Sequence, residues 1–141
     1  MTRIFLAADS DILRPRLRMI IAEIPHIQIV GDLSDAQQIG LAPKLRNADI
    51  LIVFFPKLGL SAMRLVSAAR SANPGAILIA LTTGFHDVDE DEWKTAGATY
   101  TFNLTTQLQQ FIDCLSMYGR TGVVLDRRES NDEVQSKETN T

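Results

Sequence analysis

The segment from residue 50 to residue 55 constrains the fold of this chain more than any other stretch. It reads Ile-Leu-Ile-Val-Phe-Phe, with no polar residue alternating between the apolar ones. Such a strand needs apolar cover on both faces, which is typical of a central strand in a parallel sheet. Pro56 and Gly59 then predict that the chain leaves the sheet. Ligand crevices of open parallel sheets lie just beyond the carboxyl ends of central strands, and this one ends in two phenylalanines.

Four further apolar segments predict strands, and they are residues 4–8, 27–30, 76–81 and 100–102. Between the strands, apolar residues recur every three or four positions, which predicts amphipathic helices. These helices are expected to begin near Asp11, near Ser34 or Asp35, after Ser61, among the acids at 87–92, and near Leu108. The alternation predicts a doubly wound, flavodoxin-like α/β fold, a five-stranded parallel sheet with helices on both faces. The strand order 2-1-3-4-5 would place the crevice between the first and third strands.

Glycine and proline residues predict where several elements end. Pro25 and Gly97 should end the first and fourth helices, and Gly31 should close the second strand. Gly40 and Pro43 both fall inside the second helical pattern. We therefore expect that helix to be weak or broken.

Length and charge limit the classes of function. The 141 residues suit one domain, and a net charge of −3 argues against a nucleic-acid partner. The one basic cluster, Arg14, Arg16 and Arg18, spreads over more than one helix face and indicates a solvated surface. A single cysteine and the lack of a long apolar stretch favour a cytoplasmic protein without membrane contact.

The composition changes near residue 119. Residues 127–141 contain one large apolar side chain, Val134, among charged and polar ones. Such a segment buries too little surface to offset its ordering entropy. We therefore expect a folded domain over residues 1–118 and a polar, disordered tail over residues 119–141.

Four segments stand out by their order and spacing, and they are residues 3–10, 27–31, 48–53 and 97–104. Together they resemble the receiver domain of two-component response regulators, the CheY-like superfamily, and the resemblance covers about residues 2–118. It implies a phosphorelay signalling protein. In that family, an aspartate ending the third strand accepts a phosphoryl group from a histidine kinase. Two acids after the first strand hold Mg²⁺, and a Thr or Ser and a Lys after later strands contact the phosphoryl oxygens.

Only half of that set is present in this chain. Asp9 matches one of the two acids and Thr82 matches the switch hydroxyl, whereas Ala8 stands at the second acid position and Phe54 at the acceptor position. The lysine position falls on Leu104 without a gap in the alignment, or on Asn103 with one. The resemblance thus implies a degenerate phosphorylation pocket, formed by Ala8, Asp9, Phe54, Thr82 and Leu104.

The missing groups predict a pseudo-receiver with no catalytic residue. One acid offers Mg²⁺ too few anionic ligands, so we expect neither a metal site nor any other cofactor. Asp49 lies five residues before Phe54, about 16 Å away at the opposite edge of the sheet, so it cannot replace the acceptor. Asp32 and Asp87 could approach the crevice, although neither is on the third strand. Phe54 and Leu104, if they face each other, would fill the former pocket with apolar surface.

Protein binding is the function that these losses favour. The resemblance implies docking to a histidine kinase or another signalling protein, or self-dimerisation, through the fourth helix, fifth strand and fifth helix. Trp93, Tyr100 and Phe102 belong to that surface. Trp93 stands among charged residues, which favours exposure as a binding anchor; core packing against Leu81 or Tyr100 is the alternative.

Two other functions remain as alternatives. One is a functional single-domain response regulator that is phosphorylated at an atypical acid such as Asp9. The other is a flavin binder, which the acidic sequence of residues 8–11 disfavours because a phosphate-binding loop is normally rich in glycine and hydroxyls. A hydrolytic enzyme is disfavoured further, because no nucleophile, base and orienting group can be assembled.

Overall fold

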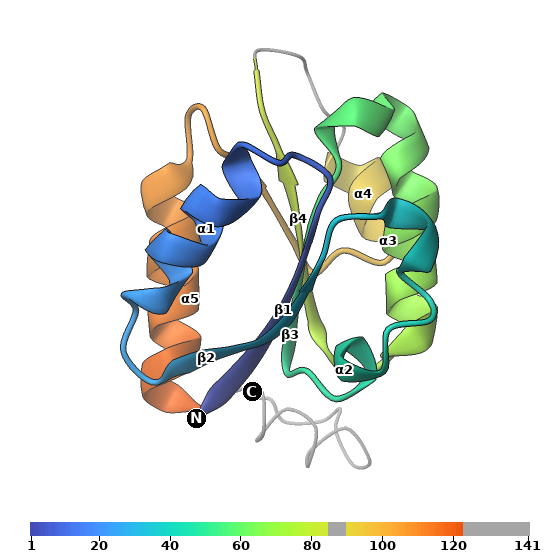
Figure 1. The fold of residues 1–141 in the computed structure, drawn as a ribbon. Helices are drawn as coiled ribbons and strands as arrows, with labels where there is room; N and C mark the ends of the chain where they lie inside the picture. The colour runs from blue at the N-terminus through green and yellow to red at the C-terminus, as the bar shows by residue number, and fades with distance from the viewer. Residues whose placement is uncertain (85–89, 123–141) are drawn as a thin grey trace.

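The apolar run forms the middle strand of the sheet. In the computed structural model, which describes residues 1–84 and 90–122, five strands run parallel in the order β2-β1-β3-β4-β5 (Figure 1). The predicted doubly wound fold and strand order are confirmed. The strands are β1 (Thr2–Ala8), β2 (Ile27–Leu33), β3 (Ile50–Phe54), β4 (Ile77–Thr82) and β5 (Tyr100–Asn103).

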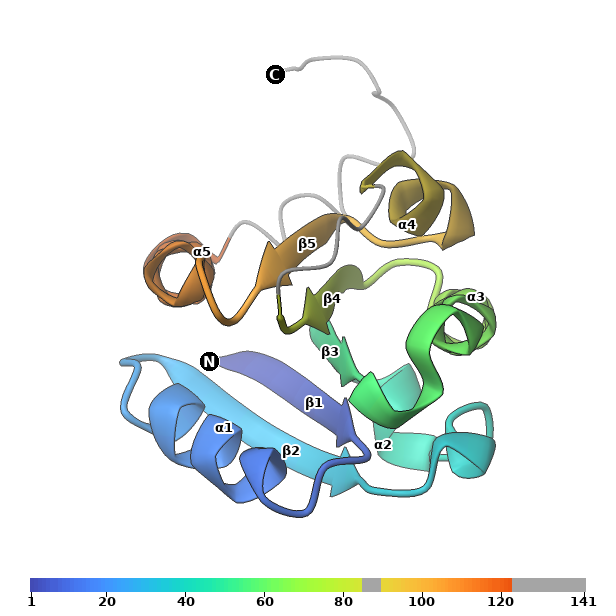
Figure 2. The same cartoon turned by 90° about the horizontal axis from the view of Figure 1, so that it is seen from above.

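Helices cover both faces of this sheet, as Figure 2 shows. Helices α1 and α5 lie on one face, and α2, α3 and α4 lie on the other. The helices are α1 (Leu13–Ala22), α2 (Pro43–Arg46), α3 (Ala62–Ala72), α4 (Glu90–Ala96) and α5 (Leu108–Thr121), with short 3-10 turns η1 (Ala36–Gln38) and η2 (Pro56–Ser61). Among the described residues, no helix is long and apolar enough to span a membrane.

The sheet separates two apolar cores, because successive strand residues point to opposite faces. The first, which we call the α1–α5 core, includes Leu6, Leu17, Ile21, Ile52, Phe54, Phe111 and Leu115. The second, the α3–α4 core, includes Phe5, Leu51, Val53, Phe55, Val66, Leu78 and Trp93. All five residues of β3 are buried, as the unbroken apolar run predicts.

The second strand is longer than the sequence indicates. Gly31 does not close β2, which continues to Leu33. The pairing register between β1 and β2 shifts between Ile4 and Phe5, so Val30 is skipped. A Cβ at Gly31 would lie 3.1 Å from the Phe5 ring, so this glycine lets the ring pack against the strand instead of ending it.

The segment after β2 is broken as predicted. Asp35 caps the η1 turn by accepting a hydrogen bond from the Gln37 backbone N–H at 2.9 Å. Helix α2 is a separate four-residue helix that begins with Pro43, where the missing N–H is not needed.

Two glycines mark the ends of the later helices. Gly97 follows α4 with φ +128°, and Gly122 follows α5 with φ +64°. Because α5 extends to Thr121, residues 119–121 are part of the folded structure, although the composition places them in the polar tail. The expected disorder of the remaining tail concerns residues 123–141, which lie outside the described residues.

Candidate functional site

The carboxyl ends of β1 and β3 lie side by side at one edge of the sheet. Ala8 pairs with Phe54 in the parallel register, and the Asp9 N–H donates to the Phe54 carbonyl oxygen at 3.1 Å. Thr82 ends β4 at the same edge, where its carbonyl accepts from the Leu104 N–H at 2.8 Å. The parallel topology therefore brings these five sequence-predicted residues to one edge of the sheet.

Phe54 turns its ring into the interior rather than toward the edge. Its side chain is fully buried in the α1–α5 core, to which Ala8 also belongs. Leu104 is partly buried and packs against the same core. The end of β3 is thus occupied by close-packed apolar side chains, and this position offers no nucleophilic atom.

Asp9 is the carboxylate beside Phe54, and its environment disfavours the charged form. The residue is 9% exposed, and its Oδ1 atom is buried with no hydrogen-bond partner among the described residues. Burial raises the pKa of Asp9 above its ordinary value, opposed by a hydrogen bond from the Lys57 backbone and by the Lys57 charge. In its protonated form this carboxyl is both a poor cation ligand and a poor nucleophile, and the raised pKa extends that form to higher pH than for an ordinary aspartate.

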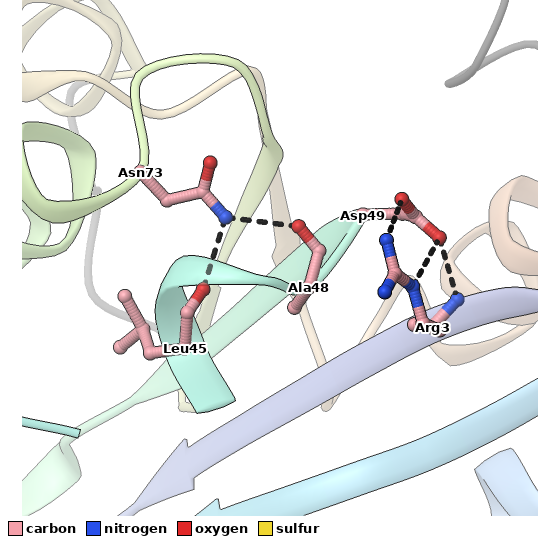
Figure 3. Close-up of polar contacts among 5 residues, drawn as sticks. All are labelled: Arg3, Leu45, Ala48, Asp49 and Asn73. Carbon is pink, nitrogen blue, oxygen red and sulfur yellow. Dashed lines mark hydrogen bonds and ion pairs between the residues drawn. The ribbon is translucent and has the colours of Figure 1, made fainter. Parts of the chain in front are cut away.

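The other candidate acids are engaged elsewhere or lie outside the described residues. Asp49 lies at the amino-terminal edge of the sheet and pairs with Arg3, its Oδ1 3.4 Å from the guanidinium (Figure 3). Asp32 pairs with Arg18 of α1 at 2.5 Å. Asp87 falls in the segment that is not described.

The residues at this edge do not fit a magnesium ion. Mg²⁺ prefers an octahedral set of oxygen ligands that includes one or two carboxylates. Within residues 1–84 and 90–122, no group of three or more His, Cys, Asp or Glu side chains could hold a metal ion. Asp9, the carboxylate next to Phe54 at this edge, is itself buried, and one carboxylate gives Mg²⁺ too few anionic ligands.

A neutral hydrogen-bond clasp includes Asn103, the position on which the family's lysine falls if the alignment has a gap. The Asn103 side-chain amide donates to the Gly84 carbonyl at 2.8 Å, and the Gly84 N–H donates to Thr105 Oγ1 at 2.9 Å. Asn103 Oδ1 also accepts from the Thr105 N–H at 2.8 Å. These bonds tie the chain after β4 to the chain after β5 without a charge. The gapped alignment on Asn103 was the only signal for this group in the sequence.

The expectation that Trp93 is an exposed anchor is wrong. Trp93 is 5% exposed and belongs to the α3–α4 core. Core packing is therefore the correct alternative, although Leu81 and Tyr100 lie on the opposite side of the sheet, at the α1–α5 core. The charged neighbours of Trp93 were misleading because α4 is a short helix that turns one large side chain inward.

Tyr100 and Phe102 form a half-buried aromatic pair on β5, an edge strand. Their rings stack with centroids 6.0 Å apart. The Tyr100 and Tyr118 hydroxyls are 2.8 Å apart, and the ring centroids of Phe102 and Phe111 are 6.0 Å apart. Because Phe111 and Tyr118 belong to α5, the aromatic pair packs against that helix. The sheet thus ends in an aromatic edge that packs against α5 and is partly open to solvent.

Comparison with known proteins gives a match in structure alone. No protein-family model matches the sequence, and no curated protein matches it. Among solved structures, a protein described as a pilus assembly protein (cpaE) from Burkholderia thailandensis has a TM-score of 0.68 at 15% identity, covering 83% of this chain and 97% of that chain.

Two response regulators give similar agreement. The response regulator domain of Thermotoga maritima CheB has a TM-score of 0.66 at 16% identity, covering 85% of this chain and 94% of that chain. A LuxR-family two-component response regulator from Aurantimonas sp. SI85-9A1 has a TM-score of 0.66 at 21% identity, covering 94% of this chain and 100% of that chain. At such low identity, these similarities show only that this chain has the same fold as these receiver domains.

Proposed function

We propose that this chain is a pseudo-receiver, a signalling module that binds a protein partner without being phosphorylated. The burial of Phe54 is the observation that supports this proposal most directly. An acceptor must present a nucleophilic oxygen to the phosphoryl group. The phenyl ring at that position is fully buried, packs in the α1–α5 core and has no oxygen that could accept a phosphoryl group.

The surroundings of Phe54 support the same function. Ala8 stands where receiver domains carry the first of two acids, so that carboxylate is absent here. The second acid, Asp9, is buried and has a raised pKa. The Asn103–Gly84–Thr105 clasp holds the chain after β4 by neutral hydrogen bonds. We therefore propose that the binding surface has its partner-binding conformation at all times, without phosphorylation.

The surface proposed for the partner is the edge made by β5 and α5. The stacked Tyr100 and Phe102 rings are half-buried there, and aromatic side chains held rigidly are good interface anchors. The partner we propose is a histidine kinase or another signalling protein. The receiver fold also occurs in a protein whose description concerns pilus assembly, so a role in an assembly is compatible with this fold.

Affinity capture with and without phosphodonor tests this proposal. The chain is immobilised, treated or left untreated with acetyl phosphate and Mg²⁺, and used to capture proteins from native lysate. We expect the same partner under both conditions, loss of that partner with Phe102→Ser, and retention with Arg64→Glu on α3. A partner captured only after phosphodonor treatment would contradict the proposal.

The competing function is a response regulator phosphorylated on Asp9. It is favoured by the position of this carboxylate beside Phe54, with one oxygen unpaired among the described residues. Phosphorylation of the parent chain that disappears in Asp9→Asn would establish it. If neither the parent chain nor Asp9→Asn is phosphorylated, the result supports the pseudo-receiver function.

A further inference from the structure

One side of α1, together with its N-cap Ile12 and its C-cap Glu23, carries a straight stripe of exposed residues. Ile12, Arg16, Met19 and Glu23 follow one another at spacings of four, three and four residues, which places them on one line along a helix. All four are exposed, and Ile12 and Met19 are 73% and 67% exposed, unusual values for large apolar side chains. The buried Leu17 and Ile21 hold a different side of the same helix against the sheet.

The two charges in this stripe differ from the other charges on α1. Arg14 donates to Asp11 and to the Ala8 carbonyl, and Arg18 pairs with Asp32. The Arg16 and Glu23 side chains, by contrast, make no hydrogen bond or ion pair with another described residue. The stripe therefore combines exposed apolar surface with one cation and one anion that have no partner within residues 1–84 and 90–122.

The order of these groups makes the stripe complementary to itself. Arg16 lies three residues before Met19, and Glu23 lies four residues after it. At about 1.5 Å per residue, these offsets are about 4.5 and 6 Å along the helix axis. A second copy turned antiparallel about an axis beside Met19 would place each Arg16 opposite the partner's Glu23, within about 1.5 Å of axial register.

We propose that this stripe is the interface of a symmetric dimer of this chain, in which α1 packs antiparallel against α1 of a second copy. Met19 meets its symmetry mate at the centre, and two Arg16–Glu23 pairs flank it. An isologous contact requires each charge to find its opposite on the same surface, and this stripe meets that requirement twice. A different protein would need its own matching pattern of charges to pair with Arg16 and Glu23, whereas a second copy of this chain carries that pattern already. The charges therefore favour a second copy as the occupant.

The position of α1 keeps this contact separate from the proposed partner surface. Helix α1 lies on the outside of the sheet beside β2, and no described element covers its outer side (Figure 2). Strand β5 forms the opposite edge of the sheet. Self-association through α1 therefore goes beyond the proposed function and leaves the aromatic edge free.

Sedimentation velocity of the full chain over a concentration series tests the proposal. We expect a monomer–dimer equilibrium, weakened at high salt because exposed ion pairs are screened. Arg16→Glu and Glu23→Arg each place like charges opposite each other at two positions, so we expect each variant to bind itself at least about tenfold more weakly. Arg64→Glu, a matched charge reversal on α3, should associate like the parent chain.

Mixing the two charge-reversal variants separates this interface from a general loss of structure. An equimolar mixture of Arg16→Glu and Glu23→Arg places opposite charges together at both positions, so heterodimers should form. The double variant Arg16→Glu/Glu23→Arg should dimerise again by itself. A parent chain that stays monomeric up to millimolar concentration, single variants that associate like the parent, or a mixture that does not associate would each overturn the proposal.

Discussion

A phenyl ring at the carboxyl end of β3 affects both the chemistry and the stability of this protein. Phe54 is fully buried between α1, α5 and the sheet. The unbroken apolar run made this burial predictable, because a strand with two apolar faces leaves no side chain in solvent. The same reasoning could not identify the environment of Asp9, because the burial of a loop carboxyl depends on which other segments pack around it.

Truncation of Phe54 should be costly. Phe54→Ala removes a fully buried ring from the α1–α5 core, and we expect the free energy of unfolding to fall by about 3–5 kcal/mol. Urea denaturation measures this loss. Phe102→Ala, at a half-buried ring on the sheet edge, is the matched control and should lose clearly less. Equal losses would mean that Phe54 is not a core residue.

Asp9 should make stability depend on pH. Its pKa is raised in the folded state, chiefly by burial, so the folded chain holds this proton more tightly than the unfolded chain does. The resulting contribution is present below the ordinary aspartate pKa and is lost as the pH rises through the folded pKa. We expect Asp9→Asn to be more stable than the parent chain at neutral pH, with the difference shrinking in acid. Denaturation at several pH values measures it, and a difference that grows in acid would contradict the raised pKa.

The elements between β3 and β5 show where sequence patterns succeed and where they do not. Gly97 was correctly predicted to end α4, since glycine is the residue that tolerates a positive φ. The sequence left the burial of Trp93 as an alternative to exposure, because α4 has only seven residues, too few for a clear helical period. The Asn103 clasp was missed because its partner, Gly84, is distant in sequence and is brought close only by the pairing of β4 with β5.

Substitution of Gly97 should destabilise the link from α4 to β5. Its φ of +128° is unfavourable for other residues, and a Cβ there would lie 2.8 Å from Arg70 Cβ. We expect Gly97→Ala to lower the free energy of unfolding by more than about 1 kcal/mol. Gly40→Ala, where a Cβ would meet nothing within 4 Å, is the matched control and should change stability little. Thermal denaturation compares them, and equal effects would contradict this account.

At the scale of the whole molecule, the alternation of strands and helices was enough to predict a parallel sheet with helices on both faces, because crossover handedness and apolar periodicity are local features of the sequence. The strand order 2-1-3-4-5 was expected from the flavodoxin-like topology and could not be read from the alternation itself. The function depends instead on which side chains meet at one edge of the sheet. There the family resemblance supplied the positions and the apolar run predicted the burial of Phe54, whereas only the structure shows the burial of Asp9 and the neutral clasp at Gly84.

Intact-mass measurement after incubation with acetyl phosphate and Mg²⁺ tests the central claim most directly. A receiver domain with an intact acceptor serves as the positive control in the same experiment. A buried ring occupies the acceptor position, and Asp9, the acid that follows β1 next to it, is itself buried. We therefore expect the mass of this chain to stay unchanged while the control gains one phosphoryl group. A gain of one phosphoryl group on an aspartate of this chain would contradict the account.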